Sequence, residues 1–157
     1  MSMQIYAGKT ETHPDFGQVM GPVIGFEHWD RHTLAEDADA RYMRGEEVFI
    51  PNPDFVEDAG TSLASANARA LFAHIGLELE EDSTAEFDLE MVHSLAMRAL
   101  NGPAPHPFVP ATVSRGAMGA TMIDCGTPEG YMADQVRKLL AIIEKGRRFG
   151  ATHLCVI

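Results

Sequence analysis

An apolar stripe at helical spacing, flanked by two strand-like segments, is the feature that most constrains the fold of this chain. The stripe lies between residues 132 and 143 and consists of Met132, Val136, Leu139, Leu140 and Ile143. Residues 117–125 before it and residues 153–157 after it favour strands. A strand, a helix and a strand in this order predict a βαβ unit, with a right-handed crossover and two parallel strands that need not be neighbours. We therefore expect layers of helix and sheet.

Two earlier helices are predicted from capping boxes, in which a hydroxyl and a carboxylate three residues apart bind free amides of the first helical turn. Residues 33–36 read Thr-Leu-Ala-Glu and predict a helix over 34–44, which Gly45 ends. Residues 83–86 read Ser-Thr-Ala-Glu and predict a helix over 85–100. With the C-terminal stripe, these segments account for three helices.

A further helix is predicted to begin at Thr61 or Ser62 and to end at Gly76, because apolar residues recur between them at helical spacing. Asn67 belongs to the same stripe, where a buried amide without a partner costs about 1–3 kcal/mol. We therefore expect Asn67 to bind the backbone of a neighbouring loop, and the turn at 51–54 is the candidate. The second interpretation of Asn67 is a ligand-binding residue.

Strand-like runs occupy the N-terminal part of the chain. Residues 3–7 and 19–29 carry β-like runs interrupted by proline and glycine, which predicts a hairpin or a bent strand pair. Residues 48–50 form a short apolar piece that runs into the turn at 51–54. The prolines between 103 and 110 predict an extended connection that crosses the domain surface.

Together these segments predict an α+β fold in a single compact domain, residues 1–157. We expect three to four helices packed on a small mixed β-sheet, with the βαβ unit at the C-terminal end. A chain of 157 residues buries about two thirds of its unfolded surface, and 45% apolar residues suffice for a packed core.

The charge balance bears on the class of partner. Acidic residues number 23 and basic residues 12, which gives a net charge of −11 that phosphate repels. Direct binding to nucleic acid is therefore not expected. An acidic surface is typical of a soluble protein and is also suited to a basic protein partner.

The chain lacks the marks of a membrane or secreted protein. No apolar run approaches the roughly 20 residues that span a bilayer, and the first residues lack the pattern of a signal peptide. The cysteines, Cys125 and Cys155, lack the spacing of metal clips or redox motifs. We therefore expect a cytoplasmic protein with reduced thiols and no membrane association.

The strong catalytic and cofactor motifs are missing from the sequence. It contains no phosphate-binding loop that ends in Gly-Lys-Ser/Thr, no Gly-x-Ser-x-Gly nucleophile elbow and no His-Glu-x-x-His zinc motif. No cofactor is therefore expected, and the sequence leaves open whether the protein is an enzyme.

The segment around Trp29 is the best candidate for a metal site. His28, Asp30 and His32 lie two residues apart, so an extended backbone would point all three side chains to one side. A helical backbone would align only His28 and His32. We favour a simpler interpretation, a strand end whose polar groups are solvated next to one anchoring tryptophan.

The junction of Cys125, Gly126 and Thr127 joins the predicted strand to the long helix. Helix-start amides favour anions and lower a thiol pKa, so Cys125 is the catalytic candidate and Gly126 and Thr127 are ligand-binding candidates. Neighbouring carboxylates oppose a thiolate there. We therefore favour a structural cap, with Thr127 as the N-cap and Pro128 as the first helical residue.

Two classes of function follow from these observations. The first, which we favour, is a noncatalytic binding or regulatory domain that acts through a protein partner or as a homo-oligomer. The alternative is a small enzyme or ligand-binding domain whose site extends from Cys125 to Thr127. In that case His93, His106 or His153 would carry protons.

Overall fold

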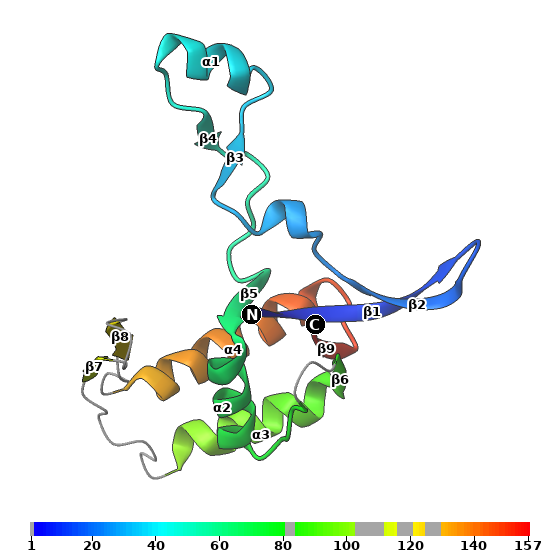
Figure 1. Cartoon of the computed structure of the whole chain (residues 1–157). Helices are drawn as coiled ribbons and strands as arrows, with labels where there is room; N and C mark the ends of the chain where they lie inside the picture. Colours follow the sequence, from blue (N-terminus) through cyan, green and yellow to red (C-terminus); the bar gives the residue numbers. More distant parts are fainter. Residues whose placement is uncertain (1, 81–83, 103–111, 116–120, 125–129) are drawn as a thin grey trace.

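The computed structural model describes residues 2–80, 84–102, 112–115, 121–124 and 130–157. Figure 1 shows the arrangement of its helices and strands and confirms the predicted α+β class. In chain order the elements are β1 (Ser2–His13), β2 (Gly17–Pro22), the short 3-10 helix η1 (Phe26–His28), β3 (His32–Leu34), α1 (Ala38–Arg44), β4 (Phe49–Pro51), β5 (Gly60–Ala64), α2 (Ser65–Ile75), β6 (Ala85–Asp88), α3 (Leu89–Asn101), β7 (Thr112–Arg115), β8 (Thr121–Asp124), α4 (Tyr131–Arg148) and β9 (His153–Val156).

The central sheet is built around β1. Its strand order is β2-β1-β9-β6, and β5 also pairs with β1. One edge of β1 serves two partners, because its first half pairs with β5 and its second half pairs with β2 as a hairpin. The other edge binds β9, with Ile5 opposite Val156. The hairpin predicted near the N-terminus is confirmed.

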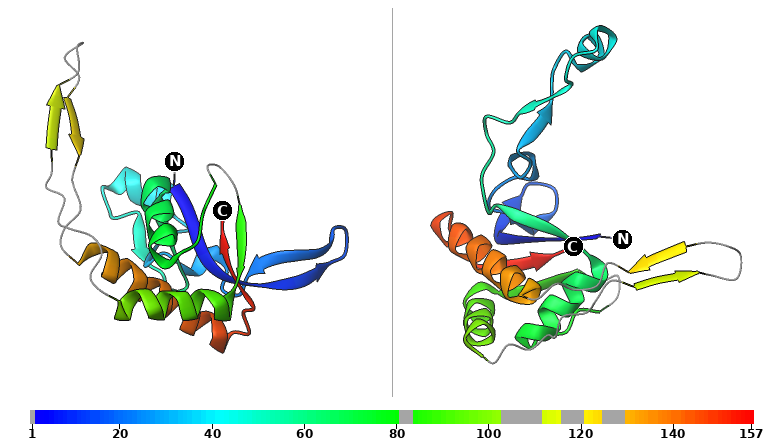
Figure 2. Two further views of the ribbon diagram at one scale, coloured as in Figure 1. Left: turned by 90° about the horizontal axis from the view of Figure 1, so that it is seen from below. Right: turned by 90° about the vertical axis from the view of Figure 1, so that its left-hand side faces the viewer.

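The core lies between this sheet and helices α2, α3 and α4, which Figure 2 shows on one side of the sheet. Alternation along β1 directs Met3, Ile5 and Ala7 to the helix side. The stripe predicted for the C-terminal helix is confirmed, because Leu140 is partly buried and the other four residues are buried, namely Met132, Val136, Leu139 and Ile143. Helix α4 therefore covers the sheet with the predicted face.

The opposite face of the sheet carries a small aromatic cluster. Tyr6 contacts Phe26 edge to face, with ring centroids 5.4 Å apart, and lies 6.0 Å from the Trp29 ring. The indole Nε1 of Trp29 donates a hydrogen bond to the Ile24 carbonyl at 3.2 Å. Trp29 packs directly over Gly60 of β5. The turn at 25–29 is thus seated on the sheet.

Two segments project from the sheet (Figure 1). The outer part of the β1–β2 hairpin extends to one side. Residues 32–51, which we call the α1 arm, contain the antiparallel pair β3 and β4 with helix α1 between them. In Figures 1 and 2 the α1 arm rises on the side of the sheet away from α2, α3 and α4.

The predicted strand-helix-strand order is present at the C-terminal end as β8, α4 and β9. The two strands belong to different sheets, however, because β8 pairs with β7, whereas β9 pairs with β1 and β6. The described pairings are antiparallel, so the central sheet is not the mixed sheet that we predicted. Both edges of β9 are bound to earlier strands, which leaves no place beside it for β8.

The predicted helix ends agree better with the structure than the predicted starts. Gly45 and Gly76 end α1 and α2 in the left-handed conformation, with φ of 70° and 91°. Helix α1 begins only at Ala38, and α3 begins at Leu89, where Asp88 accepts a hydrogen bond from the Met91 amide. Both predicted helices are therefore present, but neither begins at its predicted capping box.

Strands occupy the residues where three helices were predicted to start. Residues at these positions belong to β3, β5 and β6, so their amides bind neighbouring strands and require no helix cap. Helix α4 begins at Tyr131 after Gly130, so Thr127 is not its N-cap and Pro128 is not its first residue. The proline-rich segment at 103–110 lies outside the described residues. Among the helices described, none is long and apolar enough to cross a bilayer.

Candidate functional site

The α1 arm presents its large apolar side chains to solvent. Tyr42 and Met43 of α1 are 76% and 84% exposed. Leu34 and Phe49 form a cross-strand pair between β3 and β4 and are 57% and 58% exposed. Isolated exposed apolar residues are common on proteins, but here four of them lie on one short projecting segment, which makes the α1 arm the candidate site.

The α1 arm has almost no buried interior. Ala35 is buried, and its amide donates to the Val48 carbonyl at 2.9 Å. Helix α1 contains no buried residue. A surface helix normally turns its large apolar residues inward, whereas α1 turns Tyr42 and Met43 outward. The conformation of the α1 arm must therefore be held by something other than an apolar core.

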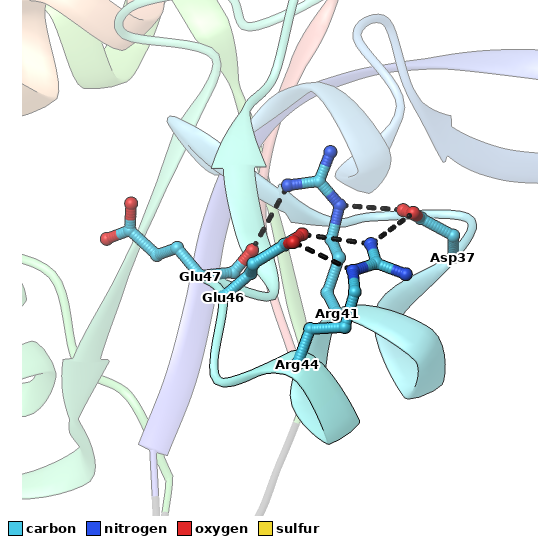
Figure 3. Close-up of polar contacts among 5 residues, drawn as sticks. All are labelled: Asp37, Arg41, Arg44, Glu46 and Glu47. Atoms are coloured by element: carbon cyan, nitrogen blue, oxygen red, sulfur yellow. Dashed lines mark hydrogen bonds and ion pairs between the residues drawn. The ribbon is translucent and has the colours of Figure 1, made fainter.

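Ion pairs and hydrogen bonds supply that support, as Figure 3 shows. The Arg41 Nε donates to Asp37 Oδ1 at 2.7 Å, and Arg41 Nη1 donates to the Glu47 carbonyl at 3.3 Å. Arg44 donates to Glu46 Oε1 at 2.7 Å and to Asp37 Oδ2 at 3.4 Å. The Arg41 hydrogen bond lowers the pKa of Asp37, and the Arg44 hydrogen bond lowers the pKa of Glu46.

Asn52 connects the base of the α1 arm to the turn that is seated on the sheet. Its Nδ2 donates to the carbonyls of Glu27 and Asp30 at 2.9 and 3.0 Å, and its Oδ1 accepts from the Asp54 amide at 3.0 Å. The backbone amide of Asn52 also donates to the Arg31 carbonyl at 2.8 Å. One side chain thus ties residues 52–54 to the backbone at Glu27, within the turn, and at Asp30, directly after it.

The role predicted for Asn67 is performed by Asn52. Asn67 is exposed, because α2 begins at Ser65 and turns Ala68 and Leu71, not Asn67, toward the core. The expectation that Asn67 faces the core is therefore wrong, and its role as a ligand-binding residue stays a prediction. The sequence did carry a signal for Asn52, because an Asn between two prolines favours an Asx turn over regular structure.

Replacement of Asn52 by alanine is expected to lower the free energy of unfolding by about 1–3 kcal/mol, because three backbone groups lose their partner. Amide exchange should also become faster throughout residues 26–31 and 52–56. Asn67→Ala is the matched control and should change stability by less than about 0.5 kcal/mol. Denaturation and hydrogen exchange measure both effects, and equal behaviour of the two variants would contradict the assigned role of Asn52.

Two pockets lie side by side at the base of the α1 arm and share His28 and Asp54 as a common wall. The larger has a volume of about 570 Å³, and the smaller about 300 Å³. The His28 Nδ1 lies 3.1 Å from the Asp54 carbonyl, and the Val56 amide donates to the His28 carbonyl at 2.8 Å. This shared wall is therefore held by side-chain and backbone hydrogen bonds.

The metal candidates His28, Asp30 and His32 do not form a site. Residues 26–28 are a 3-10 helix, so the extended backbone that would align the three side chains is absent. Within the described ranges, no three His, Cys, Asp or Glu side chains are grouped closely enough to hold a metal ion. The hydrogen bond of His28 to the Asp54 carbonyl instead gives it a structural role.

The candidates Cys125, Gly126 and Thr127 lie outside the described residues, as does His106. Their predicted catalytic and ligand-binding roles therefore stay predictions. Of the other two predicted proton carriers, His93 pairs with Glu144 of α4, with Nε2 and Oε1 3.3 Å apart. The Nδ1 of His153 lies 2.8 Å from the Thr152 hydroxyl.

Cys155 is a buried free thiol on the aromatic side of the sheet. Burial and, to a smaller extent, the charge of Glu86 raise its pKa to about 11, although a hydrogen bond from the Tyr6 hydroxyl partly offsets them. Because the thiolate is the nucleophilic form, the raised pKa and the burial of Cys155 both disfavour a reactive role at neutral pH. Its position supports packing and not chemistry.

Comparison of the chain with models of protein families, with curated proteins and with solved structures gives no match.

Proposed function

We propose that this protein is a noncatalytic binding domain that contacts another protein through the α1 arm. The observation that carries the proposal is the outward orientation of Leu34, Tyr42, Met43 and Phe49 on a segment that its own ion pairs hold in shape. Exposing large apolar side chains opposes folding unless a partner covers them. A segment held in its binding conformation also loses little entropy when the partner binds.

The charge of the α1 arm indicates the chemistry of the partner. The arm carries five carboxylates and two guanidinium groups, and both guanidinium groups are already paired with Asp37 and Glu46. The side chain of Glu47 points away from them (Figure 3). We propose a partner with an apolar pocket bordered by lysine or arginine, because complementary charge favours that encounter.

Self-association through the α1 arm is the less favoured alternative to this proposal. Two copies of the chain each carry a net charge of −11, and both would present an acidic arm to the other. Like charges placed opposite one another oppose association.

We place the encounter with the partner in the cytoplasm, in keeping with the reduced thiol of Cys155.

A photo-crosslinking experiment tests the proposal. Benzoylphenylalanine incorporated at Tyr42 should crosslink the partner in the native cells, whereas the same group at Arg137, on the exposed surface of α4, should not. With the partner purified, Tyr42→Ser combined with Met43→Ser should weaken binding by about 30-fold or more, as expected for interface hot spots worth about 2 kcal/mol.

Three results would contradict the proposal. The first is the same set of crosslinked proteins from both positions. The second is a change in affinity of less than about threefold for the double variant, which would place the binding surface elsewhere. The third is a crosslinked product that consists of two copies of this chain, which would replace the partner by self-association.

A further inference from the structure

The two pockets at the base of the α1 arm, which together we call the base groove, differ in chemistry. The smaller pocket is mainly apolar and is lined by Val23, Ile24, Val56 and Phe149 besides the shared wall. Phe149 is 51% exposed, so part of its ring is open to a ligand. The larger pocket is lined mainly by polar and charged residues. One ligand could therefore place an apolar group and a polar group on either side of His28.

The larger pocket has an excess of negative charge. Its carboxylates belong to Glu27, Glu36, Asp37 and Asp54, and its only guanidinium group belongs to Arg41. Arg41 already binds Asp37, so those two charges largely neutralise each other. The other three acidic residues that line the pocket have no described cationic partner besides the His28 ring, whose Nε2 lies 3.3 Å from Glu27 Oε1. Such a lining favours a lysine or arginine side chain.

Hydrogen bonds within the chain hold the walls of the base groove in place. Asn52 fixes the backbone around Glu27 and Asp54, and the Val56 amide binds the His28 carbonyl. The wall that the two pockets share consists of two residues, His28 and Asp54, so the pockets are adjacent. In an extended peptide, side chains two residues apart lie on the same side and are about 7 Å apart. That spacing suits two neighbouring pockets.

We propose that the base groove binds a polypeptide segment in which an apolar side chain is followed or preceded, within two residues, by lysine or arginine. The apolar side chain enters the pocket of Val23, Val56 and Phe149, and the cation enters the pocket of Glu36 and Asp54. This inference rests on the proposed function, because the segment belongs to the partner that the α1 arm contacts.

Selection from a random 12-residue peptide library on the full-length protein tests the proposal. Peptides with an apolar residue within two positions of lysine or arginine should be enriched. The affinity of one enriched peptide is then measured for the wild-type protein and for the Glu36→Gln/Asp54→Asn variant, in which the backbone bonds of Asp54 are kept. Binding should weaken at least tenfold in this variant and should also weaken as salt concentration rises.

A matched control makes the same charge change outside the base groove. Asp39→Asn/Glu47→Gln should leave the affinity for the peptide within about twofold of the wild-type value, and so should Tyr42→Ser/Met43→Ser. Equal weakening by Asp39→Asn/Glu47→Gln would overturn the inference, because binding would then depend on overall charge alone.

Other outcomes separate this inference from the proposed function. Enriched peptides that are lost only in the Tyr42→Ser/Met43→Ser variant would overturn the base groove as a binding site and leave the α1 arm as the docking surface. Enrichment without basic residues would overturn the ligand chemistry proposed here. No enriched peptide, together with no specific crosslink from position 42, would overturn both proposals.

Discussion

Replacement of Gly146 by alanine is expected to destabilise the protein by about 1–3 kcal/mol, although the same change inside a helix usually stabilises by about 0.5–1 kcal/mol. Gly146 is buried in α4, where the helix crosses β1. A Cβ added there would overlap the Cβ of Ala7 and would lie 3.2 Å from the Cβ of Ala151. Neither alanine has a rotamer that can move aside, so the helix must shift away from the sheet.

A double-mutant cycle measures this contact. Ala7→Gly removes the side chain that the new Cβ would meet, so Ala7→Gly/Gly146→Ala should recover much of the stability that Gly146→Ala loses. Denaturant unfolding of the wild type, the two single variants and the double variant gives the coupling free energy. An increase in stability for Gly146→Ala alone would contradict close packing of α4 on β1.

The elements that sequence predicted well are those decided by local spacing. The stripe at 132–143 defines a helix face wherever the rest of the chain lies, and the β-like run at 3–7 predicts a strand. Gly45 and Gly76 end their helices because a left-handed residue there requires no distant partner. These predictions depend only on neighbours along the chain.

The predictions that failed depended on distant parts of the chain. Residues 33–36 match the sequence of a capping box, but residues 33 and 34 belong to β3. This strand is stabilised by pairing with β4, which comes later in the sequence. Residues 85–88 likewise form β6 against β9 at the C-terminal end. A capping signal is worth about 1 kcal/mol, which the hydrogen bonds and packing of a completed sheet outweigh.

The candidate functional site was the least predictable part. The sequence places apolar residues of the α1 arm, such as Leu34 and Tyr42, on a helix predicted over 34–44. Nothing in their spacing indicates that they face solvent. Their exposure follows from the projection of β3, α1 and β4 away from the core helices (Figure 1). The base groove joins residues 23–28 to 52–56 and to Phe149, which only the folded chain brings together.

The packing of Trp29 on Gly60 connects the sheet to the candidate site and supports the second large prediction. A Cβ at Gly60 would overlap the outer edge of the Trp29 ring, and its distance to the indole Cε2 would be 2.8 Å. The ring is also held by Phe26, with centroids 4.7 Å apart, and by the Ile24 carbonyl. Gly60→Ala is therefore expected to displace the indole and to destabilise the protein by about 1–3 kcal/mol.

Trp29 is the only tryptophan of the chain, so its fluorescence reports this displacement directly. The emission of Gly60→Ala should shift to longer wavelength as the indole becomes solvated, and amide exchange should become faster in residues 25–31. Gly21→Ala is the matched control, because Gly21 also lies in a strand and an added Cβ there meets nothing within 4 Å. It should leave both measurements unchanged.

Because residues 25–31 carry His28 and the carbonyls that Asn52 binds, Gly60→Ala should also weaken binding at the base groove without altering its lining. Unchanged fluorescence and exchange in Gly60→Ala would show that the turn is not seated on the sheet and that the walls of the base groove are not fixed by this contact.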